Sequence, residues 1–407
     1  MKGRHPNSTA NGTLPINLDH LRLMTDGTGV LQHAAFSIPR YQDGYCLDDN
    51  ARALLLMTLV EDAGTAKTKE VRPLAFRYLA FVNHAFNGER GRFRNFLPYS
   101  RQWAEECGSE ESHGRAIWAL GCVVGRASDP GQLSLSNNLF HVALPAAQGF
   151  SSPRAWAYAL LGIDEYLRAF EGDSSIQSVR KNLAERLLGL FQRTSTSDWP
   201  WFEDRVTYCN ARLPQALIVS GSRMADEAMR EVGLKSLAWL VSVQRSGDDY
   251  FAPIGSNGFY VRGEPKAAFD QQPVEACGMV SACLEARRVT GDDQWTKHAR
   301  RAFGWLLGEN HLQQSLYDAT TGGCRDGLHA DNVNANQGAE STLSFLLALT
   351  EMYSADGIGG ARTVRGVRLR RRAFTGKPGL DWLREESALA LSQNKKQILH
   401  SASRSLS

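Results

Sequence analysis

The 407-residue chain lacks several features that would assign it to a class at once. No apolar run approaches the ~20 residues of a membrane span, and the N-terminal segment MKGRHPNSTANGTLP has no apolar stretch that could act as a signal peptide. The seven cysteines are odd in number and include no CxxC pair, which argues against a disulfide framework and for a reducing compartment. These absences predict a cytoplasmic protein with no membrane span.

Motifs for cofactors are missing as well. No GxGxxG or GxxxxGK[ST] segment is present, so no nucleotide cofactor is expected, and no other cofactor is predicted. Four cysteines lie within conspicuous motifs (Cys46, Cys209, Cys277 and Cys324), but without the short spacing of metal ligands, so no metal is predicted. The net charge of +3 is local, because the run RTVRGVRLRRR at 362–372 carries the excess. We interpret this run as a solvated tail that contacts neither nucleic acid nor a membrane.

Helical periodicity dominates what is present. Alternating strand patterns are scarce, and GFYVRG at 258–263 is the best of them. Six times, a polar and aromatic-rich loop runs into a helix that is small and apolar around most of its circumference: 45–57, 110–121, 151–162, 209–221, 269–280 and 336–349. Between these units lie helices with one apolar stripe and one charged face: 71–86, 178–193, 227–245, 293–308 and, more weakly, 135–147.

Helices that are apolar all round are buried, and helices with one apolar stripe form an outer layer. Their alternation predicts an all-α fold, an (α/α)6 toroid with an inner and an outer helix ring, over residues 14–355. We expect a flexible N-terminus at 1–13 and a basic, partly disordered tail at 356–407 with a possible helix at 379–393. That helix, or one at the N-terminus, could complete the sixth hairpin.

This architecture predicts where the polar loops meet. The inner helices of such a toroid run the same way, so their N-terminal loops gather at one end, where free N–H groups point into the mouth. The six helix starts, Asp49, His113, Ser152, Asn210, Gln272 and Gln337, are therefore expected around one opening.

Six motifs carry a resemblance to a known family. TDGTGVLQHAAFSIPRYQDGYCLDDNARALL, SEESHGRAIWALG, SPRAWAYALLG, WPWFEDRVTYCNARLPQALI, FDQQPVEA and LHADNVNANQGAESTLSFLLAL together resemble an (α/α)6 barrel of the six-hairpin glycosidase-like superfamily. More narrowly, they are similar to the barrel domain that bacteria fuse to, or encode beside, family-4-type glycosyltransferases. The superfamily implies carbohydrate chemistry, and the narrower resemblance implies a separately encoded glycosyltransferase as a partner.

Cleavage of a glycosidic bond needs a proton donor and a second carboxylate, and the loops supply a surplus of acids. Asp204 and Asp270 are the predicted acid/base pair because each lies beside an apolar ring and a polar or cationic neighbour, which can separate their pKa values. Asp49 and Glu340 are the alternative candidates for the two catalytic roles. For Asp49 the structural alternative is a helix cap, and for Glu340 it is a favourable interaction with the helix dipole.

The remaining candidates would bind substrate. Trp199, Trp201 and Tyr45 offer flat faces for sugar rings, and the arginines could either lock the carboxylates together or hold phosphate. His113 could be a proton shuttle or the partner of a helix cap, and Glu275 a capping-box residue. The full predicted binding set is Tyr45, Asp48, Asn50, Arg52, His113, Arg115, Arg154, Trp199, Trp201, Glu203, Asn210, Arg212, Gln271, Gln272, Glu275, Asn336 and Gln337.

Three functions are compatible with these residues. The first is a carbohydrate-active enzyme that cleaves an oligosaccharide of bacterial glycan metabolism by hydrolysis or phosphorolysis. The second is a non-catalytic module that binds a glycan or docks to a glycosyltransferase, and it predicts that an arginine neutralises each of Asp49, Glu203, Asp204, Asp270 and Glu340. The third is a sugar epimerase or isomerase, which would need a histidine base such as His113 or His329.

Overall fold

The computed structural model describes residues 14–355, and within them almost all regular structure is helical. The helices of this part of the chain are α1 (Asp19–Leu23), α2 (Leu47–Ala63), α3 (Thr68–Ala85), α4 (Glu110–Arg126), α5 (Pro130–Ala147), α6 (Pro153–Leu167), α7 (Ser174–Thr194), α8 (Arg212–Met224), α9 (Glu227–Val243), α10 (Pro273–Thr290), α11 (Gln294–Leu306) and α12 (Ala339–Ala355). The predictions that concern residues 1–13 and 356–407, including the helix at 379–393, lie outside the described residues.

Short antiparallel strand pairs brace the loops. Each strand has two residues: β1 (Ala34–Ala35) with β2 (Ile38–Pro39), β3 (Tyr45–Cys46) with β6 (Phe96–Leu97), β4 (Phe86–Asn87) with β5 (Arg92–Phe93), β7 (Arg205–Val206) with β8 (Tyr260–Val261), β9 (Tyr317–Asp318) with β10 (Gly323–Cys324), and β11 (Gly327–Leu328) with β12 (Val333–Asn334). The strand expected within 258–263 is thus present as β8.

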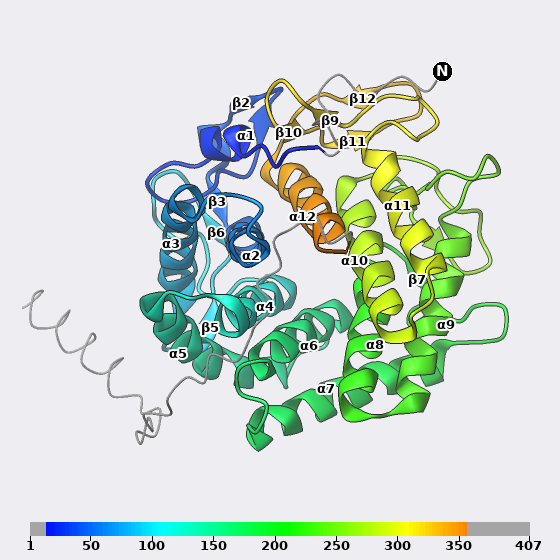
Figure 1. Cartoon of the computed structure of the whole chain (residues 1–407), viewed down its shortest axis with the longest axis horizontal. Helices are drawn as coiled ribbons and strands as arrows, with labels where there is room; N and C mark the ends of the chain where they lie inside the picture. Colours follow the sequence, from blue (N-terminus) through cyan, green and yellow to red (C-terminus); the bar gives the residue numbers. More distant parts are fainter. Residues whose placement is uncertain (1–13, 356–407) are drawn as a thin grey trace, which may run out of the picture. The chain divides into compact units, whose positions relative to one another are not determined.

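The even-numbered helices form a closed inner ring (Figure 1). α2 packs on α4, α4 on α6, and so on through α8, α10 and α12, which returns to α2. The outer helices α3, α5, α7, α9 and α11 each pack on the inner helix that precedes them in the chain. The prediction of an all-α (α/α)6 toroid is confirmed. The five-residue helix α1 contacts α12, so within the described residues the N-terminal segment takes the sixth outer position.

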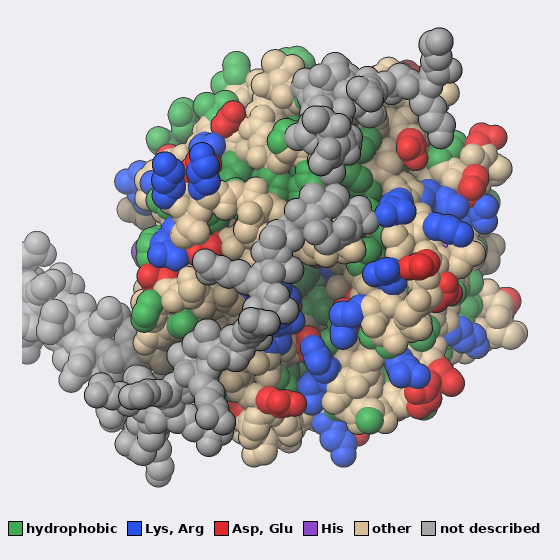
Figure 2. All heavy atoms as spheres, in the orientation of Figure 1, with side chains coloured by type: hydrophobic (Ala, Val, Ile, Leu, Met, Phe, Trp, Pro, Cys, Tyr) green, Lys and Arg blue, Asp and Glu red, His purple; other side chains and the backbone are tan. Residues whose placement is uncertain are grey.

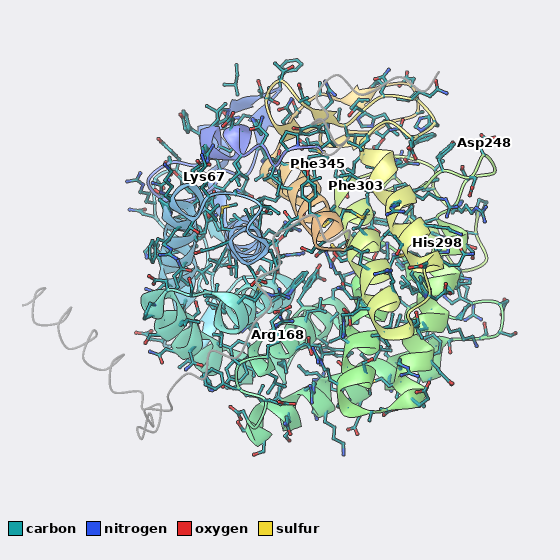
Figure 3. The ribbon with its side chains drawn as sticks, in the orientation of Figure 1. Lys67, Arg168, Asp248, His298, Phe303 and Phe345 are labelled. Carbon is teal, nitrogen blue, oxygen red and sulfur yellow. The ribbon has the colours of Figure 1, made fainter. Side chains whose placement is uncertain are left out.

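Burial follows the two predicted helix types. In α2 and α12 most residues are buried on every side, whereas α7 and α11 bury a single stripe. Large apolar side chains pack between the inner and the outer helices. Phe303 of α11 and Phe345 of α12, labelled in Figure 3, are an example, with stacked aromatic rings whose centroids lie 5.9 Å apart. On the face drawn in Figure 2, acidic and basic side chains are mixed over the surface.

Glycines allow two inner helices to approach closely. A Cβ atom added at Gly121 of α4 would lie 2.0 Å from the carbonyl oxygen of Gly162 of α6, and one added at Gly162 would lie 2.6 Å from the carbonyl oxygen of Ile117. No side chain fits in that space. The apolar, small composition of the inner helices therefore has a direct packing reason.

Two cavities show that the inner helices run in the same direction. The first cavity is lined by residues at or just before the starts of α2, α4, α8, α10 and α12. The second is lined mainly by residues from the middle and later turns of α2, α4, α6, α8, α10 and α12, with Gln215 from the first turn of α8 as the exception. The start of α6 joins the first mouth through Ser152, whose N–H group donates to Glu110 at the start of α4. The polar loops therefore meet at one end.

No helix of residues 14–355 combines the length and the apolar character needed to cross a bilayer.

Candidate active site

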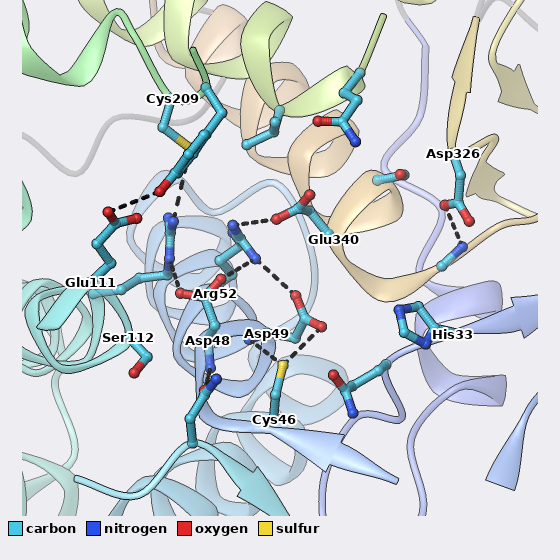
Figure 4. Close-up of a pocket in the computed structure, with 18 of the residues that line it drawn as sticks. His33, Cys46, Asp48, Asp49, Arg52, Glu111, Ser112, Cys209, Asp326 and Glu340 are labelled. Atoms are coloured by element: carbon cyan, nitrogen blue, oxygen red, sulfur yellow. Dashed lines mark hydrogen bonds and ion pairs between the residues drawn. The ribbon is translucent and has the colours of Figure 1, made fainter. Parts of the chain in front are cut away.

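The first cavity has a volume of about 500 Å³ and is open to solvent (Figure 4). Its walls come from distant parts of the chain, which the toroid brings together. The lining residues are Gln32, His33, Cys46, Asp48, Asp49, Arg52, Asn95, Phe96, Ser109, Glu111, Ser112, Arg115, Tyr208, Cys209, Gln272, Val274, Asp326, Asn334, Gly338, Glu340 and Ser341.

Arg52 of α2 joins three of the cavity's carboxylates (Figure 4). Its Nη1 atom lies 2.7 Å from Asp48 and 2.9 Å from Asp49, and its Nη2 atom lies 2.5 Å from Glu340 of α12. Arg115 of α4 donates a second charged hydrogen bond to Asp48 and lies over the ring of Tyr158. These contacts connect the inner helices α12, α2, α4 and α6 across the mouth. They agree with the interpretation that the arginines hold the carboxylates together.

The two neighbouring aspartates have opposite electrostatic environments. Burial raises the pKa of Asp48, but Arg115 and Arg52 together outweigh it, so the net pKa is below the ordinary value. Burial is also the largest influence on the pKa of Asp49, where Arg52 and, more weakly, the hydrogen bond from Cys46 oppose it and the charges of Glu340 and Asp48 add to it. The pKa of Asp49 is therefore raised to about 6. Asp49 can carry a proton near neutral pH, whereas Asp48 stays ionised.

Cys46 makes a reciprocal contact with Asp49. Cys46 is the N-cap of α2, and its sulfur accepts a hydrogen bond from the Asp49 N–H group at 3.4 Å. Its S–H group donates to Asp49 Oδ2 at 3.2 Å. Cys46 rather than Asp49 is therefore the helix cap, which corrects the structural alternative stated above, and Asp49 lies in the first turn of the helix with its carboxyl group at the cavity.

Two further carboxylates line the cavity outside the ion pairs that Arg52 and Arg115 make. Glu111 accepts hydrogen bonds from the hydroxyl groups of Ser152 and Tyr208, each at 3.0 Å. Asp326 accepts the Gly338 N–H group at 2.8 Å, and its burial raises its pKa. The binding-module hypothesis required an arginine at each of Asp49, Glu203, Asp204, Asp270 and Glu340. Arg52 pairs with Asp49 and Glu340, and Arg154 pairs with Glu203, whereas Asp270 is bound to His329.

The structure brings six of the predicted site residues into this cavity, namely Asp48, Asp49, Arg52, Arg115, Gln272 and Glu340. The alternative catalytic candidates Asp49 and Glu340 are among them, and the predicted acid/base pair, Asp204 and Asp270, is not. Asp204 is exposed and lines neither cavity. Asp270 also lies outside both cavities, and its carboxylate is hydrogen bonded to His329 Nδ1.

The predicted sugar-stacking rings are core residues instead. Trp199 packs against Trp239 and Tyr260, and its indole N–H group donates to the Glu203 carbonyl oxygen. Trp201 is completely buried against the same Trp239. Tyr45 is also fully buried, with its hydroxyl group 2.6 Å from Asp26. The stretch from Trp199 to Pro214 is therefore mainly a folded core segment, and only Tyr208 and Cys209 of it reach the cavity.

His113 is structural as well. Its ring is fully buried, accepts the Phe93 N–H group at Nδ1 and lies 3.0 Å from the Ala143 carbonyl oxygen at Nε2. Burial lowers the pKa of His113 to about 3, so the ring is neutral. Since both nitrogens are engaged outside the cavity, His113 has no access to a substrate there.

The remaining predicted residues contact other protein groups in the loops and the inner helices. Their contacts are Asn50 with Val30 and Cys46, Arg154 with Glu203, Asn210 with Glu275, Arg212 with Gln215, Gln271 with Trp305, Asn336 with Phe36, and Gln337 with Thr321 and Asp318. All these partners are protein groups, and none of these predicted residues lines the first cavity.

Sequence reasoning did not assign several lining residues a role. Glu111 was visible as a surplus acid in the motif SEESHGRAIWALG, and Tyr208 within the aromatic stretch. His33 and Asp326 come from loops, and Phe96 comes from the two-residue strand β6, so no periodic signal marks any of them.

One group of carboxylates has the spacing of a cation site. Asp48, Asp49 and Glu340 each place an oxygen within 4.8 Å of the others. Each of the three is also within ion-pair distance of Arg52, so a bound cation would have to displace that guanidinium group.

No protein-family model and no curated protein matches this chain. Among solved structures, the chain is similar to cellobiose 2-epimerase from Bacillus thermoamylovorans B4167, with 12% identity, a TM-score of 0.64 and coverage of 83% of this chain and 96% of that one. A D-mannose isomerase gives 14% identity, a TM-score of 0.59, and 83% and 94% coverage. A GH76 α-mannanase from Bacteroides thetaiotaomicron has 11% identity and a TM-score of 0.53, and the match covers 76% of this chain and 86% of that one. At such identities the similarity shows the fold, which this chain shares with carbohydrate-active enzymes that include hydrolases, epimerases and isomerases.

Proposed function

We propose that the protein is a glycoside hydrolase that cleaves an oligosaccharide in the first cavity, with Asp49 as the general acid and Glu340 as the second carboxylate. One observation carries this proposal: two carboxyl groups lie close together at the cavity wall, and burial raises the pKa of one of them, Asp49, to about 6. Asp49 can hold a proton near neutral pH, while Glu340 is paired with Arg52 and 43% exposed. A buried carboxyl group with a raised pKa beside a more exposed carboxylate is typical of acid/base pairs.

The spacing of the pair favours one stereochemical course. Oxygen atoms of Asp49 and Glu340 lie within 4.8 Å of one another. A separation of no more than 4.8 Å is shorter than the ~6.5–9.5 Å of inverting glycosidases and compatible with the ~5 Å of retaining ones. In the proposed reaction Asp49 protonates the leaving oxygen, Glu340 attacks the anomeric carbon, and the Asp49 carboxylate then activates the water that releases the sugar.

The charge of the cavity favours hydrolysis over phosphorolysis. Five carboxylates line it, namely Asp48, Asp49, Glu111, Asp326 and Glu340, and the arginines among the lining residues are Arg52 and Arg115. Both arginines already bind carboxylates. A phosphate dianion would enter a region of negative potential, whereas a neutral glycan finds many hydrogen-bond acceptors.

Purified protein assayed against a panel of oligosaccharides, with and without phosphate, tests this function. We expect turnover without phosphate and release of the sugar with retained anomeric configuration, which proton NMR can identify. Asp49→Asn and Glu340→Gln should each reduce kcat by about 10²–10⁴-fold. Glu185→Gln, on the exposed face of α7, is a matched control that should leave kcat unchanged.

The sequence-based assignment of Asp204 and Asp270 as the acid/base pair predicts the opposite result. If Asp204→Asn and Asp270→Asn abolish turnover while Asp49→Asn does not, the proposed assignment is wrong. A requirement for phosphate would replace hydrolysis by phosphorolysis.

A sugar isomerase or epimerase is the second candidate. It is supported by the fold shared with an epimerase and an isomerase, and by His33, a histidine that lines the cavity 3.3 Å from Asp43. A reaction through His33 would exchange a carbon-bound hydrogen of the sugar with solvent. Incorporation of deuterium from D₂O, lost in His33→Asn, would favour this candidate over the hydrolase.

The binding module with a glycosyltransferase partner stays a third hypothesis. It predicts glycan affinity by calorimetry without turnover of any panel member, and it predicts that Asp49→Asn leaves this affinity nearly unchanged.

A further inference from the structure

The cap of α2 differs in chemistry from the caps of α4 and α6, two other helices of the inner ring. Ser109 caps α4 and Ser152 caps α6, each through a hydroxyl oxygen that accepts an N–H group. Serine is among the preferred N-cap residues, because its oxygen is a good acceptor. At the corresponding position of α2 the chain has Cys46, whose sulfur is a weaker acceptor and whose S–H group is a weaker donor.

This cysteine is placed on the carboxyl group that the proposed reaction needs in its protonated form. Cys46 lines the cavity beside Asp49, and both polar contacts of its sulfur, at 3.2 and 3.4 Å, are to that one residue. Burial raises the pKa of the Cys46 thiol well above its ordinary value, so the sulfur is a neutral S–H group. The charged groups that face Asp49 are Arg52 and Asp48 on its own helix and Glu340 on α12.

A hydroxyl group in the same place would act differently. An O–H donor bound to a carboxylate stabilises the ionised form more strongly than an S–H donor does. A serine would therefore improve the cap and at the same time make Asp49 a poorer proton carrier. An apolar residue would remove both the cap and the donor.

We propose that Cys46 is a positioning residue for the reaction, whose thiol fixes the Asp49 carboxyl group at the cavity wall by a reciprocal pair of weak hydrogen bonds and so leaves it able to carry the proton. This inference rests on the proposed function for its catalytic meaning. The coupling between the thiol and the carboxyl group can be measured without any activity.

The test is a carboxyl NMR titration of protein labelled with carbon-13 at its aspartate carboxyl carbons, with the Asp49 signal assigned by its loss in Asp49→Asn. We expect Cys46→Ser to lower the titration midpoint of Asp49 by roughly 0.5–1 on the pH scale. Cys46→Ala should raise it, because the donor is lost. Cys122→Ser, a buried thiol of α4 that lines the second cavity, is the matched control and should leave the midpoint in place.

The direction of the two changes separates positioning from packing. A thiol that only fills space predicts no change in Cys46→Ser, or the same direction of change in the serine and alanine variants, and either result would overturn the inference. Movement of the Asp49 midpoint in Cys122→Ser by a similar amount would also overturn it.

Kinetics supply the second readout. The alkaline limb of the kcat profile should move to lower pH in Cys46→Ser by the same amount as the NMR midpoint, while thermal stability is kept or increased. A limb that stays in place overturns the catalytic part of the inference. If Asp49→Asn retains turnover, the proposed function fails, and the titration still decides whether Cys46 controls Asp49.

Discussion

Adjacent aspartates in the motif LDDNA should respond to the same substitution with opposite changes in stability. Asp49 has its pKa raised from 3.8 to about 6 in the folded protein, mainly by burial. The folded state therefore binds this proton more tightly than the unfolded chain, and stability falls as the pH rises from about 4 to about 6. A difference of about 2.2 pH units corresponds to roughly 3 kcal/mol of destabilisation above pH 6.

Asp49→Asn removes this ionisation penalty. The asparagine oxygen can still accept a hydrogen bond from Arg52, but without the charge the bond is weaker by about 1 kcal/mol. We therefore expect Asp49→Asn to be about 2 kcal/mol more stable than the wild type at pH 7.5, which is roughly 4 °C in Tm. At pH 4, where the wild-type carboxyl group is protonated, the advantage should vanish.

Asp48→Asn is the matched comparison. The pKa of Asp48 is lowered by Arg115 and Arg52 against the effect of burial, so this group contributes stability that is present above pH ~4 and lost as the pH falls through its folded pKa. Its removal leaves Arg115 without its carboxylate partner and should cost about 3 kcal/mol at pH 7.5. Urea unfolding of both variants between pH 4 and 8 measures the two effects. Equal destabilisation by the two substitutions at pH 7.5 would refute the electrostatic argument.

Three further predictions concern packing and the cavity rim. Gly121→Ala should destabilise the fold by about 3 kcal/mol or prevent folding, because its Cβ atom would overlap the carbonyl oxygen of Gly162, and thermal unfolding will show it. His113→Ala should cost about 2–4 kcal/mol at neutral pH, since a buried ring and its hydrogen bonds are lost. With a folded pKa of about 3 against an unfolded value of ~6.5, the wild type loses stability below pH 6.5, so this cost should shrink in acid, as denaturation at pH 5 and 7.5 can test. Tyr208→Phe removes the hydroxyl group bound to Glu111 at the cavity rim and should raise KM by roughly fivefold with little change in stability; an unchanged KM would place the substrate elsewhere.

The ion pairs of Arg52 show what local sequence could and could not predict about the site. Arg52 and Asp49 are three residues apart on a helix, so their ion pair follows from helical spacing. The third partner, Glu340, is nearly three hundred residues away and joins them only because α12 closes the ring onto α2. The ranking of the acids depends on that closure: Glu340 and burial raise the pKa of Asp49, whereas Asp204, with similar sequence neighbours, remains exposed.

The aromatic residues illustrate the same limit. Trp199 and Trp201 stand in a polar stretch without a helical stripe, which suggested a binding surface. Residue Trp239 of α9 packs against both of them and makes them core residues. A neighbour on another helix is invisible to any local pattern.

The sequence by itself determined the class of fold, because the difference between helices that are apolar all round and helices with a single apolar stripe is a local property that dictates which ring each helix joins. It also determined that the polar loops share one mouth, since parallel inner helices must begin at the same end. Only the tertiary structure decided which acids face the cavity and which of them carries a proton. Burial and long-range charge set those properties, and both depend on residues that the closed ring brings together from opposite ends of the described chain.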